Sequence, residues 1–208
     1  METFIFLMEI AGTIAFSVSG ALIGIEKKMD IFGVTILGLT TAVGGGVIRD
    51  LIIGSTPPQT FQNPVYAMVA IIVAVIIFLC AFFWHIHYDR IFFELLVFVM
   101  DSLGLGIFTV VGISTAYNTS HDFGNFLLIF VGVITGVGGG VLRDMLAGNT
   151  PYIFVKHVYA CASLAGAILC VYLIPVMGLR NAMFLGMTIT VVIRFLSRHY
   201  RWNLPRMR

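Results

Sequence analysis

The sequence predicts an all-α membrane protein with seven transmembrane helices. Of its 208 residues, 59% are hydrophobic and only 11% are charged, and the mean hydropathy is +1.02. Soluble domains carry about 25% charged residues, and a soluble chain of this size has too small a core for so much apolar surface. The chain also contains successive apolar segments of about 20 residues, which is the length that crosses a bilayer.

Seven apolar segments are separated by short loops. The last is the weakest, because its uncharged stretch runs only from Asn181 to Ile193, and we expect Arg180 and Arg194 to extend from it toward the membrane surfaces. The first is predicted to span the membrane rather than act as a cleavable signal, because it carries Glu9 and no basic region precedes it. The predicted spans are residues 4–25, 31–53, 65–87, 92–116, 124–147, 157–177 and 178–196.

The distribution of basic residues predicts the orientation in the membrane. Cytoplasmic loops are enriched in lysine and arginine, and with seven spans nine loop or tail residues lie on one side and only Arg180 on the other. We therefore expect a cell-membrane protein with its N-terminus outside and its C-terminus in the cytoplasm. The tail fixes this topology or contacts anionic lipid. Its arginines are Arg194, Arg198, Arg201, Arg206 and Arg208. A net charge of +2 gives no indication of nucleic-acid binding.

A duplicated motif predicts the architecture. Residues 44–57 read GGGVIRDLIIGSTP and residues 138–151 read GGGVLRDMLAGNTP, with nine of fourteen positions identical. Fainter upstream matches include Glu9 with Asp101, Gly12 with Gly104 and Phe16 with Phe108. Each copy contains three spans, and an odd number inverts the second copy, as in many transporters. We expect a 3+3 inverted repeat formed by residues 1–90 and 91–177, followed by a seventh helix and basic tail at 178–208.

Two glycine triplets lie within the second and fifth predicted spans. Glycine weakens a helix interior by about 1 kcal/mol relative to alanine, so each triplet predicts a kink or a short unwound stretch whose carbonyls face an ion path. Close packing of neighbouring helices is the alternative, because small residues let backbones approach. The residues concerned are Gly44, Gly45, Gly46, Gly138, Gly139 and Gly140.

Six charged residues lie within the predicted spans. Burial of such groups costs about 2.5–3.5 kcal/mol each, so they should face the bundle interior and be paired. Neighbours on a helix do not face each other, so each arginine is expected to have a partner other than the adjacent aspartate. Depth in the membrane predicts that Glu9 lies near Arg49 and Asp101 near Arg143, in direct contact or through one water. These charges either lock helices together or form a gate. The six are Glu9, Arg49, Asp50, Asp101, Arg143 and Asp144.

The sequence shows no catalytic pattern. It contains no Ser/His/Asp set, no nucleotide fingerprint and no metal-ligand spacing, so we expect neither an enzyme nor a cofactor. Cys80, Cys161 and Cys170 lie in apolar runs and are expected to be free thiols.

The paired GGGVIRD and GGGVLRD motifs resemble those of the prokaryotic branch of the trimeric intracellular cation channel family, and the resemblance covers nearly the whole chain. It implies a homotrimer in which each subunit carries a pore for monovalent cations, chiefly potassium. It also implies that the pore surrounds kinked second and fifth helices, at the two glycine triplets with Arg49 and Arg143.

Two functions therefore remain open. The first is a potassium-permeable channel with one pore per subunit, and the second is a secondary transporter of a small neutral solute such as glycine, a transport activity linked to some bacterial relatives. Inverted repeats and broken helices suit both. A membrane protein with only a structural or assembly role is a third reading.

Overall fold

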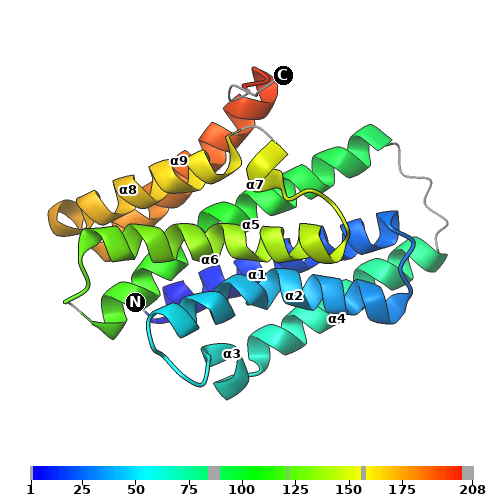
Figure 1. The fold of residues 1–208 in the computed structure, drawn as a ribbon, viewed down its shortest axis with the longest axis horizontal. Coiled ribbons are helices and arrows are strands. Elements are labelled where there is room, and N and C mark those ends of the chain that lie inside the picture. The colour runs from blue at the N-terminus through cyan, green and yellow to red at the C-terminus, as the bar shows by residue number, and fades with distance from the viewer. Residues whose placement is uncertain (1, 84–89, 121, 156–157, 203–208) are drawn as a thin grey trace.

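The computed structural model describes residues 2–83, 90–120, 122–155 and 158–202. These described residues form seven long helices and two short ones, with no strand among them (Figure 1). The long helices are α1 (Glu2–Glu26), α2 (Ile31–Ile52), α4 (Val65–Phe83), α5 (Arg90–Thr119), α6 (Asn125–Leu146), α8 (Tyr159–Met177) and α9 (Leu179–His199). The short helices α3 (Gln59–Gln62) and α7 (Tyr152–Val155) follow α2 and α6.

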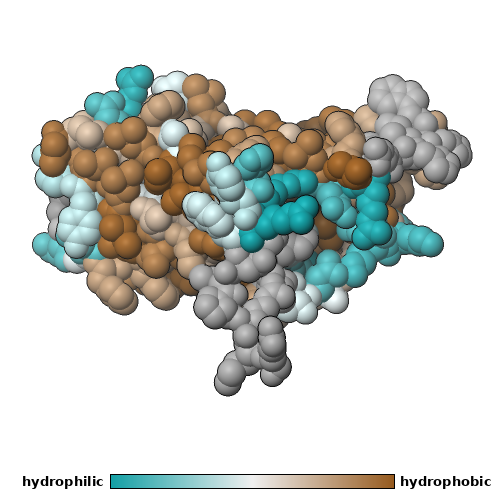
Figure 2. Space-filling view, turned by 90° about the horizontal axis from the view of Figure 1, so that it is seen from above, coloured by the Kyte–Doolittle hydropathy of each residue, from teal (hydrophilic) through white to brown (hydrophobic). Residues whose placement is uncertain are grey.

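Within the described ranges, all seven long helices are long and apolar enough to cross a membrane, which confirms the predicted fold class. The third predicted span extended to residue 87, and the tail to Arg206 and Arg208, both beyond the described residues. Helix α4 has the highest mean hydropathy, 3.0, yet only 11% of its most apolar stretch is buried. Hydrophobic residues cover the upper and left parts of the face in Figure 2, beside a group of hydrophilic residues at its centre and right. Such a surface is stable against lipid or another apolar surface.

The long helices form two inverted halves and one additional helix. Helices α1, α2 and α4 form the first half, and α5, α6 and α8 form the second. Helix α1 runs opposite to α5, and α2 runs opposite to α6 (Figure 1). The halves meet where α1 packs on α5 and α2 packs on α6, and α9 packs on α8 and α5. Helix α9 therefore contacts the second half without having a counterpart in the first.

Reciprocal aromatic contacts join the halves at the centre of the bundle. Phe16 on α1 covers Gly104 on α5, where an added methyl group would lie 2.1 Å from the ring. Phe108 on α5 covers Gly12 on α1, where a methyl group would lie 3.0 Å from the ring. The two ring centroids are 5.3 Å apart. We call these residues the Phe16–Phe108 pair, and both glycines are needed for it to pack.

Both glycine triplets lie within uninterrupted helix, so the short unwound stretches considered from the sequence are not formed. The glycines instead let α2 and α6 cross in backbone contact. A methyl group at Gly45 would lie 2.2 Å from the carbonyl oxygen of Thr135, and one at Gly139 would lie 2.1 Å from that of Thr41. Close packing, the alternative considered from the sequence, therefore accounts for Gly45 and Gly139.

A glycine ends each motif helix in the same way. Gly54 after α2 has a φ of +75°, and Gly148 after α6 has a φ of +67°. The backbone N–H of the next residue donates at 2.8 Å to the carbonyl of Asp50 in one half and of Asp144 in the other. This is the Schellman arrangement, which favours glycine because its φ is positive. The repeated spacing from Arg-Asp to glycine thus encodes a helix end.

We expect Gly45→Ala and Gly139→Ala each to destabilise the protein. The added methyl group meets the backbone of the facing helix, and overpacking of this kind costs about 1–3 kcal/mol. Gly46→Ala is the matched control, because the nearest atom to its methyl group is Arg49 Nη2 at 3.8 Å. Thermal unfolding of the three variants in one detergent checks this. Equal unfolding temperatures of the three variants would contradict the backbone contact between α2 and α6 at Gly45 and Gly139.

Candidate functional site

The arginine of the second motif lies in a polar cluster between three helices. Arg143 on α6 donates through Nη1 to Asp101 Oδ1 on α5 and to Ser19 Oγ on α1, both at 2.6 Å. The side chains of Arg143 and Asp101 are fully buried. The Tyr159 hydroxyl donates to Asp101 at 3.4 Å. The Asp101–Arg143 pair expected from the sequence is therefore present.

Each motif arginine also pairs with the aspartate that follows it. Arg143 Nη2 lies 2.8 Å from Asp144 Oδ1, and Arg49 Nε donates to Asp50 Oδ1 at 2.8 Å. The expectation that an arginine and the aspartate next to it do not pair was therefore wrong, although Arg143 also has the separate partner Asp101. The reason is the length of arginine and its five donors, which let the guanidinium fold back onto a carboxylate that stays buried near the helix end.

The same aspartates hold the short helices in place. The second carboxylate oxygen of Asp50 accepts the backbone N–H of Gln59 at 2.8 Å, and that of Asp144 accepts the N–H of Tyr152 at 2.9 Å. The first N–H groups of a helix have no partner within it. Asp50 and Asp144 therefore attach α3 and α7 to the ends of α2 and α6.

A second arginine reaches the Asp101 cluster from α9. Arg194 Nη2 lies 3.5 Å from Asp101 Oδ2, and its side chain is only 3% exposed. The guanidinium carbon lies 4.7 Å from the Tyr159 ring centroid and 4.9 Å from that of Phe98. The expectation that Arg194 extends to the membrane surface was wrong, because a carboxylate and two aromatic faces offset its loss of hydration.

The spacing of residues along α9 contains a signal for this burial. Gly186, Thr190, Arg194 and Ser197 follow one another at helical intervals of four, four and three, and all four are buried. Such spacing places them on one face, and small residues on that face indicate close packing. Arg180, near the start of the helix, is exposed as expected.

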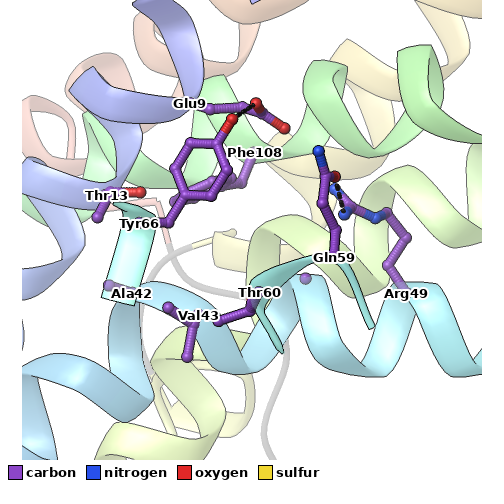
Figure 3. A pocket seen from close by; sticks show the side chains of 10 residues that line it. Glu9, Thr13, Ala42, Val43, Arg49, Gln59, Thr60, Tyr66 and Phe108 are labelled. Carbon is purple, nitrogen blue, oxygen red and sulfur yellow. Dashed lines mark hydrogen bonds between the residues drawn. The ribbon is translucent and has the colours of Figure 1, made fainter. Parts of the chain in front are cut away.

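The first half has a corresponding cluster with different contacts. The Tyr66 hydroxyl on α4 donates to Glu9 Oε2, and Arg49 Nη2 donates to Gln59 Oε1 at 3.5 Å (Figure 3). Glu9 and Arg49 line the same cavity, but in the described part of the chain no ion pair within 4.0 Å joins them. Glu9 and Arg49 thus share a cavity, as their expected proximity requires, but they do not form an ion pair. Tyr66 on α4 binds Glu9 instead, and Gln59 on α3 binds Arg49.

This first-half cavity, the Glu9 cavity, has a volume of about 30 Å³. One water needs about 10–15 Å³ on this measure, so the cavity has room for about two. Figure 3 shows the Glu9 carboxylate directed toward Gln59 and Arg49. The polar and glycine positions that line it are Glu9, Thr13, Gly46, Arg49, Gln59 and Tyr66.

A second cavity, the Arg194 cavity, has a volume of about 440 Å³. It lies at the other end of the bundle, where α1 ends and α5 begins. Its polar lining combines three arginines with two glutamates and a tyrosine. These residues are Glu26, Arg90, Glu94, Tyr152, Arg194 and Arg198.

Packed protein separates the two cavities. On α1, Thr13 lines the Glu9 cavity and Ile23 the Arg194 cavity, and on α5 the corresponding residues are Phe108 and Phe98. Ten residues of helix span about 15 Å. This interval contains Phe16, the Asp101–Arg143 pair and Ser19. The structure is therefore closed between the cavities along these two helices.

The two clusters place opposite charges close together, but their described residues do not form a metal-binding site. Among the described residues, no group of three or more His, Cys, Asp or Glu side chains could hold a metal ion. Cys80, Cys161 and Cys170 are free thiols. Carboxylate and hydroxyl oxygens in a confined space can replace part of a cation's hydration shell. Sequence reasoning identified the charged members of both clusters except Arg194. It also missed the neutral members Tyr66, Tyr159 and Gln59.

Comparisons relate the chain to bacterial membrane proteins. The family model described as "Glycine transporter" matches residues 6–81 and 98–175. The inner membrane protein YadS of Escherichia coli is 33% identical over 97% of this chain and 95% of its own length.

Solved structures of cation channels share the fold. The TRIC trimeric intracellular cation channel orthologue from Rhodobacter sphaeroides is 34% identical with a TM-score of 0.86, over 96% of this chain and all of that one. A prokaryotic TRIC channel solved in 0.5 M KCl is 30% identical with a TM-score of 0.89, over 98% of this chain and all of that one.

Asp101→Asn should lower stability strongly. It leaves Arg143 and Arg194 facing a neutral amide, and loss of one partner from a buried ion pair costs about 3–5 kcal/mol. Glu9→Gln is the control, because the amide still accepts from Tyr66 and no ion pair is broken, so we expect a cost below about 1 kcal/mol. Unfolding of both variants in detergent gives the comparison. Similar losses in the two would show that Asp101 is not the principal counter-ion.

Proposed function

The chain belongs to the prokaryotic branch of the trimeric intracellular cation channel family, and on this premise we propose that it conducts monovalent cations, chiefly potassium. The likeness to solved cation channels over nearly the whole of both chains carries the proposal. The channel is a homotrimer with one pore in each subunit. In each subunit the two repeats, residues 1–90 and 91–177, form the pore. Residues 178–208 form the additional helix and the tail.

The proposed ion path runs beside α2 and α6, between the Glu9 cavity and the Arg194 cavity. The position of these cavities on the same two helices, α1 and α5, supports it. Because Gly45 and Gly139 are packed against backbone, the path passes alongside the triplets rather than through opened carbonyls. The path residues are Gly44, Gly45, Gly46, Arg49, Asp50, Gly138, Gly139, Gly140, Arg143 and Asp144, with Glu9 and Asp101 as gate residues.

Opening requires the interval between the cavities to become hydrated. The Asp101–Arg143 pair and the Phe16–Phe108 pair must both move, because ions do not cross a dry apolar constriction. A guanidinium that leaves Asp101 frees a carboxylate for a passing cation. In this proposal the buried Asp101–Arg143 pair keeps the resting channel closed. The same two residues therefore both hold the helices together and act as the gate.

In the proposed topology the N-terminus lies outside and the C-terminus in the cytoplasm. The excess of basic residues on the C-terminal side supports it. The Arg194 cavity then opens toward the cytoplasm, where Arg198 and Arg201 lie near lipid head groups.

A second candidate function is a carrier for a small neutral solute such as glycine. The description of the matching family model favours it. A carrier would open its two cavities alternately around a bound solute, whereas a channel would open a continuous path.

Reconstitution into planar bilayers separates the candidates. We expect unitary currents in potassium chloride and a reversal potential near that of potassium under a salt gradient. Saturable glycine uptake into proteoliposomes without unitary current would favour the carrier instead. Neither current nor uptake would overturn both.

Gly46→Leu should lower the unitary conductance of the channel. Gly46 lines the Glu9 cavity and has open space at its Cβ position, so a leucine side chain fills room for about two waters. Gly124→Leu is the control, because Gly124 is exposed with no atom within 4 Å of its Cβ position. Equal conductance in both variants would show that the Glu9 cavity is not part of the ion path.

A further inference from the structure

The charged and tyrosine residues that the two repeats contribute to the polar clusters correspond to one another. Glu9 accepts from Tyr66 as Asp101 accepts from Tyr159. Arg49 and Asp50 pair in the first half, and Arg143 and Asp144 pair in the same way in the second. Among the described residues, the second cluster alone receives an additional charged residue, Arg194, and it comes from α9, the helix without a counterpart.

This addition changes the charge balance of the second cluster. In the first, the carboxylates of Glu9 and Asp50 face one guanidinium, that of Arg49. In the second, the carboxylates of Asp101 and Asp144 face two guanidinium groups. The first cluster is therefore formally one unit negative beside a cavity with room for water, and the second is neutral.

The contact between Arg194 and Asp101 is that of an ion with its counter-ion. Asp101 Oδ1 takes the short hydrogen bond from Arg143, whereas Asp101 Oδ2 accepts no hydrogen bond and has Arg194 Nη2 at 3.5 Å. Two aromatic rings flank the guanidinium on its way to the carboxylate. Arg194 thus places a positive charge beside a carboxylate oxygen that accepts no hydrogen bond, which is a place that a free cation can also take.

We propose that Arg194 is a tethered cation that occupies, beside Asp101, the place that a permeant monovalent cation takes beside Glu9 in the first half. It is a selectivity-determining residue, which keeps the second cluster neutral and thereby limits how strongly the Arg194 cavity attracts cations. This inference rests on the proposed channel function and names a residue that neither repeat contains.

A purely structural role for Arg194 predicts different behaviour. An arginine that only fastens α9 to α5 would affect stability when replaced, and it would leave the choice between potassium and chloride unchanged. Arg180 offers a matched control. It is an exposed arginine on the same helix, its guanidinium carbon lies 5.4 Å from the Phe4 ring centroid, and it lines neither cavity.

The test compares the wild-type protein with Arg194→Gln, Arg194→Lys and Arg180→Gln in planar bilayers under a potassium chloride gradient. We expect Arg194→Gln to raise the potassium-to-chloride permeability ratio several-fold, because it leaves a carboxylate free for a mobile cation. Arg194→Lys retains the charge and should match wild type, as should Arg180→Gln, which removes a charge remote from both cavities. Wild-type currents with an unchanged ratio in Arg194→Gln would overturn the inference and leave the channel function standing. A wild type without current would overturn the channel function.

A stability measurement tests the same site without current. We expect potassium chloride to raise the unfolding temperature of Arg194→Gln above its value in N-methylglucamine chloride of equal ionic strength, and wild type to show no such difference. If Arg194→Gln fails to fold unaided, its recovery in the two salts replaces the unfolding temperature. Equal behaviour of the variant in both salts would overturn the inference.

Discussion

Burial of arginine within an apolar bundle is the constraint on which this structure depends. A guanidinium removed from water costs several kcal/mol unless a carboxylate and further acceptors compensate it. Arg143 meets this requirement with Asp101, Asp144 and Ser19, and these partners lie on three different helices. The position of α1 relative to α5 and α6 therefore follows from the needs of one side chain. The same requirement brings α9 into contact with the second half through Arg194.

The sequence predicted the fold well because its signals were local or repeated. Seven apolar segments, and a motif repeated in two units of three spans each, lead to an inverted seven-helix bundle. The depth of the charged residues along the helices was enough to place Asp101 beside Arg143. It did not predict that Arg49 would bind Gln59 rather than Glu9, because that choice depends on where α3 returns. It also placed Arg194 at the surface, since hydropathy cannot distinguish a helix face toward lipid from one toward protein.

The glycine triplets show why a correct motif can suggest the wrong local structure. Low helix propensity indicated unwinding, yet the cost of about 1 kcal/mol per glycine is small beside the packing gained when two backbones touch. Gly45 and Gly139 face backbone carbonyls of the opposite helix, whereas Gly46 faces open space beside Arg49. Within the first triplet, one glycine thus permits the helix crossing and the next one lines a cavity. The way in which α2 crosses α6 decides which glycine has which role.

The reciprocal contact of Phe16 with Gly104 and of Phe108 with Gly12 has a consequence for how the two halves fit together. Each three-helix unit presents both a protruding ring and a notch that fits it. Two inverted copies of one such unit are self-complementary, which is the property of an isologous dimer interface. The interface between the two halves therefore has the complementarity of a symmetric dimer within a single chain.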